Sequence, residues 1–268
     1  MPLSGDEIKR LFTAPVEALH YGKDMLGYRL ADVFNKTEIP LGNNEPVIFI
    51  PAYIHGDSSL SHLKEYFEKH KYQGVFSKLG LNVFFNKEKA ENLVNDVQDL
   101  SEQEGQPVYL VGHSKGGVIA RELARRLPDH VAGYVTMGSP LNAAADKGHA
   151  ARLARSVYKS FHPEAEYLEP QDIADAMAEP VQAHGLHFYS KEDRIVKWQH
   201  CIGPGRTNIR VSSAHIGMAL DPEVIQSIGH HFDIIRKNPD FPIGTAGEVA
   251  KRLNLRVDPP SGPEAPSP

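Results

Sequence analysis

Residues 108–117 read Val-Tyr-Leu-Val-Gly-His-Ser-Lys-Gly-Gly, and residues 118–124 continue as Val-Ile-Ala-Arg-Glu-Leu-Ala. The first part is an apolar run that is typical of a buried strand, and the second part has the composition of a helix. Between them lies the pattern Gly-x-Ser-x-Gly, which requires a sharp turn from strand to helix. The stretch therefore predicts that Ser114 is raised above the end of a strand.

The two glycines of the pattern, Gly112 and Gly116, allow this turn because a Cβ at either position would clash where strand and helix approach each other. The start of the helix offers free N–H groups and a positive dipole end beside the Ser114 hydroxyl. A pattern of three fixed residues also arises by chance, but the strand-then-helix context favours a nucleophile. Because a serine hydroxyl is a weak nucleophile at neutral pH, Ser114 needs a base.

Two later loops supply the candidate partners of Ser114. A predicted strand at 208–211 is followed by a loop that carries His215, and a predicted strand at 186–189 is followed by a loop that carries Asp193. Ligands of parallel sheets bind at the carboxyl ends of the strands, so we expect these loops to meet there. The order serine, aspartate, histidine is that of an α/β-hydrolase triad.

The roles of the candidate residues follow from their chemistry. We expect His215 to accept the serine proton, and Asp193 to fix the histidine tautomer and stabilise the imidazolium. Glu192 is the competing acid. Asp193 is preferred because it precedes the apolar pair at 195–196, which can anchor the loop.

An oxyanion that forms on a substrate needs backbone donors near Ser114. We expect one donor to be the N–H of Lys115, and the other to come from the loop after the strand at 46–51. Tyr53 is the preferred second donor and Ala52 the alternative. His55 in the same loop is interpreted as a loop hydrogen-bonder.

Composition restricts the class of protein. The chain has 268 residues, 41% of them hydrophobic, which suffices for a sizeable core, and its net charge of −5 gives no sign of nucleic-acid binding. A single cysteine, Cys201, excludes an intrachain disulfide and fits a reducing compartment. No metal-ligand motif and no apolar run of transmembrane length occur, so we expect neither a metal nor a transmembrane segment. Residues 1–7 do not resemble a secretory signal, and we expect a cytoplasmic protein.

Alternating strands and helices predict an α/β domain with a mostly parallel central sheet and helices on both faces. We expect an N-terminal extension at 1–40, the α/β domain at 41–240, and a C-terminal segment at 241–268 that ends in a Pro-rich disordered tail. Besides the strand and helix that flank Ser114, the predicted strands are 46–51, 81–85, 131–137, 186–189 and 208–211. The predicted helices are 57–73, 88–104 and 222–236.

Four ordered motifs extend this interpretation. They are 112–121 (Gly-His-Ser-Lys-Gly-Gly-Val-Ile-Ala-Arg), 137–140 (Met-Gly-Ser-Pro), the acid loop 189–198 and the histidine loop 213–218. Together they cover roughly residues 45–236, and in this order they resemble the bacterial lipase and esterase branch of the α/β-hydrolases. The resemblance implies hydrolysis of a small-molecule or lipid ester without a cofactor, and it allows contact with a membrane surface.

The resemblance also places residues 142–180 where this fold inserts a cap. The segment is rich in helix formers, and its apolar residues could form the underside of a lid over Ser114; an ordinary surface helix pair is an equally weighted alternative. The apolar residues in question are Leu153, Val157, Tyr158, Phe161, Tyr167 and Leu168.

Three positions depart from the family pattern. Lys115 replaces an apolar residue, Pro51-Ala52 stands where His-Gly is usual, and Arg194 replaces a small residue. These differences leave the substrate class open. An acyltransferase or thioesterase with the same triad is the main alternative, a peptidase is a weaker one, and a non-catalytic binding module that retained the fold is the alternative outside enzymes.

Overall fold

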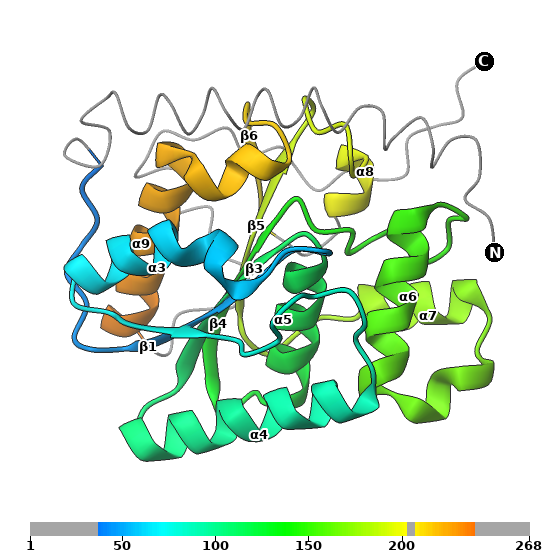
Figure 1. The fold of residues 1–268 in the computed structure, drawn as a ribbon, viewed down its shortest axis with the longest axis horizontal. Coiled ribbons are helices and arrows are strands. Elements are labelled where there is room, and N and C mark those ends of the chain that lie inside the picture. The colour runs from blue at the N-terminus through cyan, green and yellow to red at the C-terminus, as the bar shows by residue number, and fades with distance from the viewer. Residues whose placement is uncertain (1–36, 203–206, 239–268) are drawn as a thin grey trace.

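The computed structural model describes residues 37–202 and 207–238 (Figure 1). Within this part of the chain, six strands form one sheet in the order β2-β1-β3-β4-β5-β6, and every neighbouring pair is parallel. The predicted parallel sheet is therefore confirmed. The strands are β1 (Pro46–Ile50), β2 (Gln73–Phe76), β3 (Val108–His113), β4 (Val131–Met137), β5 (His184–Ser190) and β6 (Thr207–Val211).

Helices cover both faces of this sheet (Figure 1). One face packs against α3 and α9, and the other against α4 and α5. Helix α6 packs in turn on α4 and α5, and α7 packs on α6. The α-helices are α3 (Ser61–Lys69), α4 (Lys87–Glu104), α5 (Lys115–Arg126), α6 (His149–Phe161), α7 (Pro170–Ala178), α8 (Trp198–Cys201) and α9 (Pro222–Lys237). Short 3-10 helices are η1 (Asp57–Leu60), η2 (Pro163–Tyr167) and η3 (Ile216–Leu220).

The apolar strands are explained by burial on two sides. In β1, Val47 and Phe49 pack into the core on the α3 and α9 face, whereas Ile48 and Ile50 pack into the core on the α4 and α5 face. Successive side chains of a strand point to opposite faces, so a strand covered on both sides is apolar throughout.

The prediction at 81–85 is wrong. These residues form a loop, and the strand in this part of the chain is β2. The apolar side chains that suggested a strand are largely exposed, with 62% of Leu81 and 81% of Phe84 accessible to solvent. As an edge strand, β2 is only half-buried and contains a glycine, so it lacks the apolar run that marks the central strands.

Residues 142–180 contain the helices α6, η2 and α7, as their composition predicted, but their apolar side chains divide in two directions. Val157, Tyr158 and Phe161 join the core that α4 and α5 share. By contrast, 94% of Tyr167 and 41% of Leu168 are exposed. Three of the six residues expected to form an apolar underside thus fix α6 to the domain.

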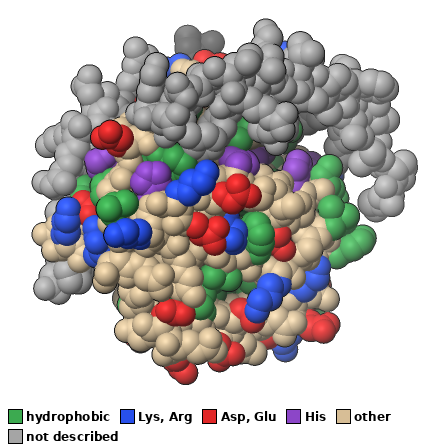
Figure 2. Space-filling view, turned by 60° about the vertical axis from the view of Figure 1, so that its left-hand side comes forward, with side chains coloured by type: hydrophobic (Ala, Val, Ile, Leu, Met, Phe, Trp, Pro, Cys, Tyr) green, Lys and Arg blue, Asp and Glu red, His purple; other side chains and the backbone are tan. Residues whose placement is uncertain are grey.

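The predicted N-terminal extension and the predicted C-terminal tail lie almost wholly outside the described residues. Basic and acidic side chains are intermixed on the face shown in Figure 2. Among the described residues, no helix has both the length and the hydropathy to cross a bilayer.

Candidate active site

Ser114 lies at the junction of β3 and α5 with φ 54° and ψ −116°. A positive φ is a strained conformation for a residue with a side chain, and such strain concentrates at functional positions. The Ser114 N–H donates to the carbonyl of Met137 at 2.8 Å, which fixes the turn to the end of β4. The serine is therefore held above the carboxyl edge of the sheet.

The two glycines of the turn have no room for a side chain. A Cβ on Gly112 would lie 2.3 Å from the carbonyl oxygen of Gly116, and one on Gly116 would lie 2.2 Å from the carbonyl oxygen of Ile50. Both distances are below van der Waals contact. Close approach of backbone to backbone therefore requires glycine at both positions.

His215 and Asp193 meet at this edge. The His215 Nδ1–H donates to Asp193 Oδ2 at 2.6 Å, and both side chains are buried. The other oxygen of Asp193, Oδ1, accepts the N–H groups of Ile195 and Val196, each at 2.8 Å. The carboxylate is thus held in one orientation by its own loop.

The competing acid, Glu192, is directed elsewhere. Its carboxylate accepts a hydrogen bond from the Ser190 hydroxyl at 2.8 Å and lies 4.0 Å from Arg210. About half of its side chain (51%) is exposed. Of the two acids, the structure brings Asp193 to His215.

Gly138 closes the site from the β4 side. This residue has φ 57°, and a Cβ there would lie 2.9 Å from His215 Nδ1 and 3.2 Å from Asp193 Oδ2. A side chain at this position would therefore strain the backbone and press on both partners of the pair. Sequence reasoning recognised the strand-end motif around this glycine but not its contact with the histidine.

His113, directly before Ser114, is a site residue that sequence reasoning missed. Its Nε2–H donates to the carbonyl of His215 at 2.8 Å, and the two rings lie 5.0 Å apart. Burial, with the nearby His215 as a smaller cause, lowers the pKa of His113 to about 3. The ring is therefore neutral at physiological pH and holds the backbone of the His215 loop beside Ser114. The presence of a histidine within the Gly-x-Ser-x-Gly pattern was the sequence signal that pointed to this residue.

The side chain of Lys115 turns toward the loop at 77–86. Its Nζ donates to the carbonyl of Val83 at 3.0 Å, and it lies 5.5 Å from the ring centre of Tyr53 and 5.8 Å from that of Phe85. The side chain is only 2% exposed. Burial, and to a smaller extent the charge of Lys89, lowers the pKa of the ammonium to about 8.

Asn82 organises the loop that carries Tyr53. Its Nδ2 donates to the carbonyl of Pro51 at 2.8 Å, its backbone carbonyl accepts the N–H of Ile54 at 3.3 Å, and its N–H donates to the carbonyl of His55 at 3.0 Å. His55 also donates through Nδ1 to the carbonyl of Tyr53 at 2.9 Å, as expected of a loop hydrogen-bonder. The loop after β1 is thus rigidly connected to the loop that Lys115 contacts.

The inserted helices reach this loop at one point. His149, the first residue of α6, places its ring 5.3 Å from that of Tyr53. Among the described residues, no group of three or more histidine, cysteine or acidic side chains has the arrangement of a metal site.

Residues 87–199 match the model of a family described as serine aminopeptidase, S33. This segment runs from α4 through the Ser114 turn to the loop of Asp193, and it lies in a parallel sheet with helices on both faces. The chain has the α/β-hydrolase fold. The resemblance found in the four motifs is therefore confirmed.

Solved structures share this fold at low sequence identity. One belongs to the metagenome-derived lipolytic enzymes LipS and LipT, with 15% identity, a TM-score of 0.53, and coverage of 75% of this chain and 96% of the other. Another is described as a putative lipase from Acinetobacter baumannii AYE, with 12% identity, a TM-score of 0.51, and coverage of 75% and 87%. No curated protein sequence matches the chain.

Proposed function

We propose that this protein cleaves carboxylic esters through an acyl-enzyme on Ser114, with His215 as the base and Asp193 as the orienting acid. One observation carries the proposal. The Asp193–His215 pair is buried, with 2.6 Å between Nδ1 and Oδ2, and His113 bonds to the carbonyl of His215. His113 directly precedes Ser114, which has the strained conformation of a nucleophile turn.

The arrangement supports the following sequence of proton transfers. Because His215 donates from Nδ1 to Asp193, its Nε2 is left to accept the Ser114 proton as the oxygen attacks the ester carbonyl. The resulting imidazolium then protonates the leaving alcohol as the C–O bond breaks and the acyl-enzyme forms. Water, deprotonated by the same histidine, attacks the acyl-enzyme and releases the acid and the free serine.

We assign the oxyanion hole to the N–H groups of Lys115 and Tyr53. The N–H of Lys115 belongs to the first turn of α5, where backbone donors have no intrahelical acceptor. In the loop after β1, the N–H groups of Ile54 and His55 are bonded to Asn82 and Ala52, which favours a donor earlier in the loop. Tyr53 is preferred, and Ala52 is the alternative.

The class of bond that is cleaved is inferred from the motifs and the comparisons. Two structures with this fold are described as lipolytic or as a putative lipase, whereas the matched family is described as an aminopeptidase. The same triad could transfer an acyl group from an ester, a thioester or an amide, to water or to another acceptor. We favour small-molecule or lipid esters with water as the acceptor.

The test has two parts. A fluorophosphonate probe should modify the folded protein at Ser114, as mapped by peptide mass spectrometry, and should leave Ser114→Ala unmodified. Rates should then be measured on p-nitrophenyl esters from acetate to laurate, on the corresponding thioesters, and on an aminoacyl p-nitroanilide. The ester series should give the highest kcat/KM.

Three results would contradict the proposal. Modification confined to residues other than Ser114 would reject the nucleophile. Faster turnover of the anilide or the thioester would reject the ester assignment but leave the triad in place. Equal and negligible rates for wild type and Ser114→Ala on every substrate would favour the binding module.

A further inference from the structure

One face of α6 is strongly basic. Arg152, Arg155 and Lys159 follow one another at spacings of three and four residues, which places them along one side of the helix. The opposite side carries Val157 and Phe161, which are buried in the core. Because the apolar side is fixed against α4 and α5, the basic side is directed away from the core.

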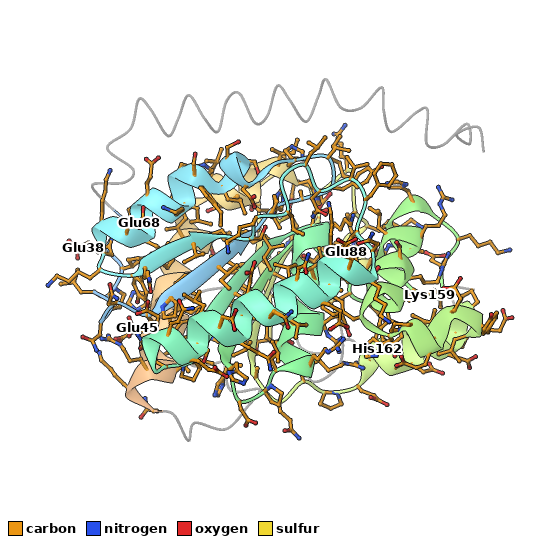
Figure 3. All side chains as sticks on the ribbon, turned by 60° about the horizontal axis from the view of Figure 1, so that its bottom comes forward. Glu38, Glu45, Glu68, Glu88, Lys159 and His162 are labelled. Atoms are coloured by element: carbon orange, nitrogen blue, oxygen red, sulfur yellow. The ribbon has the colours of Figure 1, made fainter. Side chains whose placement is uncertain are left out.

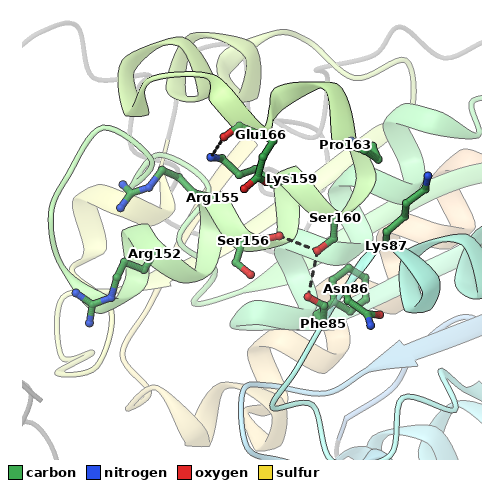
Figure 4. Close-up of a pocket in the computed structure, with 10 residues that line it drawn as sticks. All are labelled: Phe85, Asn86, Lys87, Arg152, Arg155, Ser156, Lys159, Ser160, Pro163 and Glu166. Atoms are coloured by element: carbon green, nitrogen blue, oxygen red, sulfur yellow. Dashed lines mark hydrogen bonds between the residues drawn. The ribbon is translucent and has the colours of Figure 1, made fainter. Parts of the chain in front are cut away.

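This basic face forms one wall of a cavity of about 590 Å³ (Figure 4). The opposite wall comes from the start of α4, with Phe85 and Lys87. In the view of Figure 3, α4 runs past α6 with Glu88 near the end of α4 that approaches Lys159. Two elements far apart in the sequence therefore contribute cations to the same cavity.

The charges that line the cavity are unbalanced. Four of its ten lining residues are cationic and one, Glu166, is acidic. Among the described residues, no carboxylate forms an ion pair with Lys87, Arg155 or Lys159. A cavity whose lining carries more cations than anions favours a bound anion.

Neutral acceptors hold two of these cations in place. The guanidinium of Arg155 donates to the carbonyls of Ala144 and Asp146 at 2.6 and 2.8 Å. The ammonium of Lys159 donates to the carbonyl of Glu166 at 2.6 Å (Figure 4). Carbonyl groups orient a cation without cancelling its charge, so both side chains are positioned and remain charged.

The start of α4 adds to the positive potential. This helix is 18 residues long, and its first turn lies at the cavity with Asn86 as the N-cap. The Asn86 side chain accepts only the N–H of Lys89, at 3.0 Å. The remaining N–H groups of the first turn and the positive end of the helix dipole favour an anion here.

We propose that this cavity binds the phosphate group of a small organic phosphate. A phosphate monoester carries nearly two negative charges and three acceptor oxygens, which suits several cations better than a carboxylate does. The volume falls in the range of small-molecule sites and exceeds the need of a bare ion. Phe85 and Pro163 supply the apolar part of the lining, against which the organic part would pack.

The site is distinct from the Ser114 site but shares a wall with it. The Phe85 ring lines the cavity and also lies 5.8 Å from the ammonium of Lys115. Binding at the cavity uses no residue of the proposed triad. The variant Ser114→Ala therefore separates the two proposals, because it should lose hydrolysis and keep phosphate binding.

The experiment is calorimetric titration of the full chain at low salt with inorganic phosphate, with glycerol 3-phosphate, and with phosphatidic acid in phosphatidylcholine vesicles. The variants are Lys87→Glu and the double variant Lys87→Glu/Lys159→Glu. Lys87 is the first residue of α4, where an acidic side chain suits the helix dipole, so the single variant should fold. Lys69→Glu, on the exposed end of α3, is the matched control.

We expect glycerol 3-phosphate to bind more tightly than inorganic phosphate, with affinity lowered about tenfold by Lys87→Glu, further by the double variant, and little by Lys69→Glu. Binding to phosphatidic acid vesicles alone would support the phosphate site and identify a lipid as its source. Absence of binding to all three ligands, or equal weakening by Lys69→Glu, would overturn the proposal.

Discussion

The two sides of Ser114 are built differently. On one side, the His215 ring donates to the buried carboxylate of Asp193 at 2.6 Å, and the backbone carbonyl of His215 accepts a hydrogen bond from His113. On the other side, the buried ammonium of Lys115 connects two loops. It donates to backbone carbonyls of the Asn82 loop and lies over the ring of Tyr53. The first side has the residue types that proton transfer requires. The second is organised by Lys115, which departs from the family pattern, so we expect it to determine what binds rather than which reaction occurs.

Asp193→Asn should break the first side most severely. An amide cannot stabilise the imidazolium or select the same histidine tautomer, so kcat should fall about 10⁴-fold with little change in fold. The measurement is kcat on the best p-nitrophenyl ester, with circular dichroism to confirm folding. A loss of less than tenfold would mean that Asp193 does not orient His215 during the reaction.

Gly138→Ala should disturb the same side by steric pressure. The new Cβ would meet His215 and Asp193, so we expect kcat/KM to fall about a hundredfold. Gly105→Ala is the matched control, because Gly105 has a similar φ of 63° and no atom within 4 Å of the added Cβ. Both variants should lose about 1 kcal/mol of unfolding free energy through backbone strain. Equal activity in the two variants would show that the contact at Gly138 is harmless.

Lys115→Met should disturb the second side. Without the ammonium, the Tyr53 and Asn82 loops lose a shared charged donor, and we expect kcat/KM to fall about tenfold, with a change in the preferred acyl chain. The measurement is the chain-length profile of ester hydrolysis. An unchanged profile would place Lys115 outside substrate selection.

The same variant should change the dependence of stability on pH. The folded chain lowers the pKa of Lys115 from 10.5 to about 8, so between these values the unfolded chain binds more protons. Relative to Lys115→Met, the unfolding free energy of the wild type should therefore rise as pH increases from about 8 to 10.5. This increase should be lost again as pH falls through about 8. Lys69→Met should follow the wild type in urea titrations. Parallel curves for wild type and Lys115→Met would argue against a buried ammonium.

Glu192→Gln should have the smallest effect. The glutamine retains a hydrogen bond to Ser190, and the side chain is half-exposed and does not contact His215, so kcat should change by less than about threefold. A loss comparable to that of Asp193→Asn would mean that the acid loop rearranges when substrate binds.

Sequence patterns located the central strands because burial on both faces leaves continuous apolar runs, as in β1 and β3. They failed at β2 for the opposite reason. This edge strand needs little apolar surface, while the nearby Leu81 and Phe84, which suggested a strand, are exposed. The apolar side chains of residues 142–180 did not reveal the basic face of α6, because that face is formed by the charged residues between them.

The sequence by itself determined the Ser114 turn and the order of its partners, because glycine spacing and strand order are local properties of the chain. Only the tertiary structure decided between Glu192 and Asp193, since adjacent acids differ in direction rather than in position. It also decided where the Lys115 side chain lies and brought Lys87 opposite α6. The directions of these side chains depend on contacts between segments that are distant in the sequence, so a local sequence pattern does not predict them.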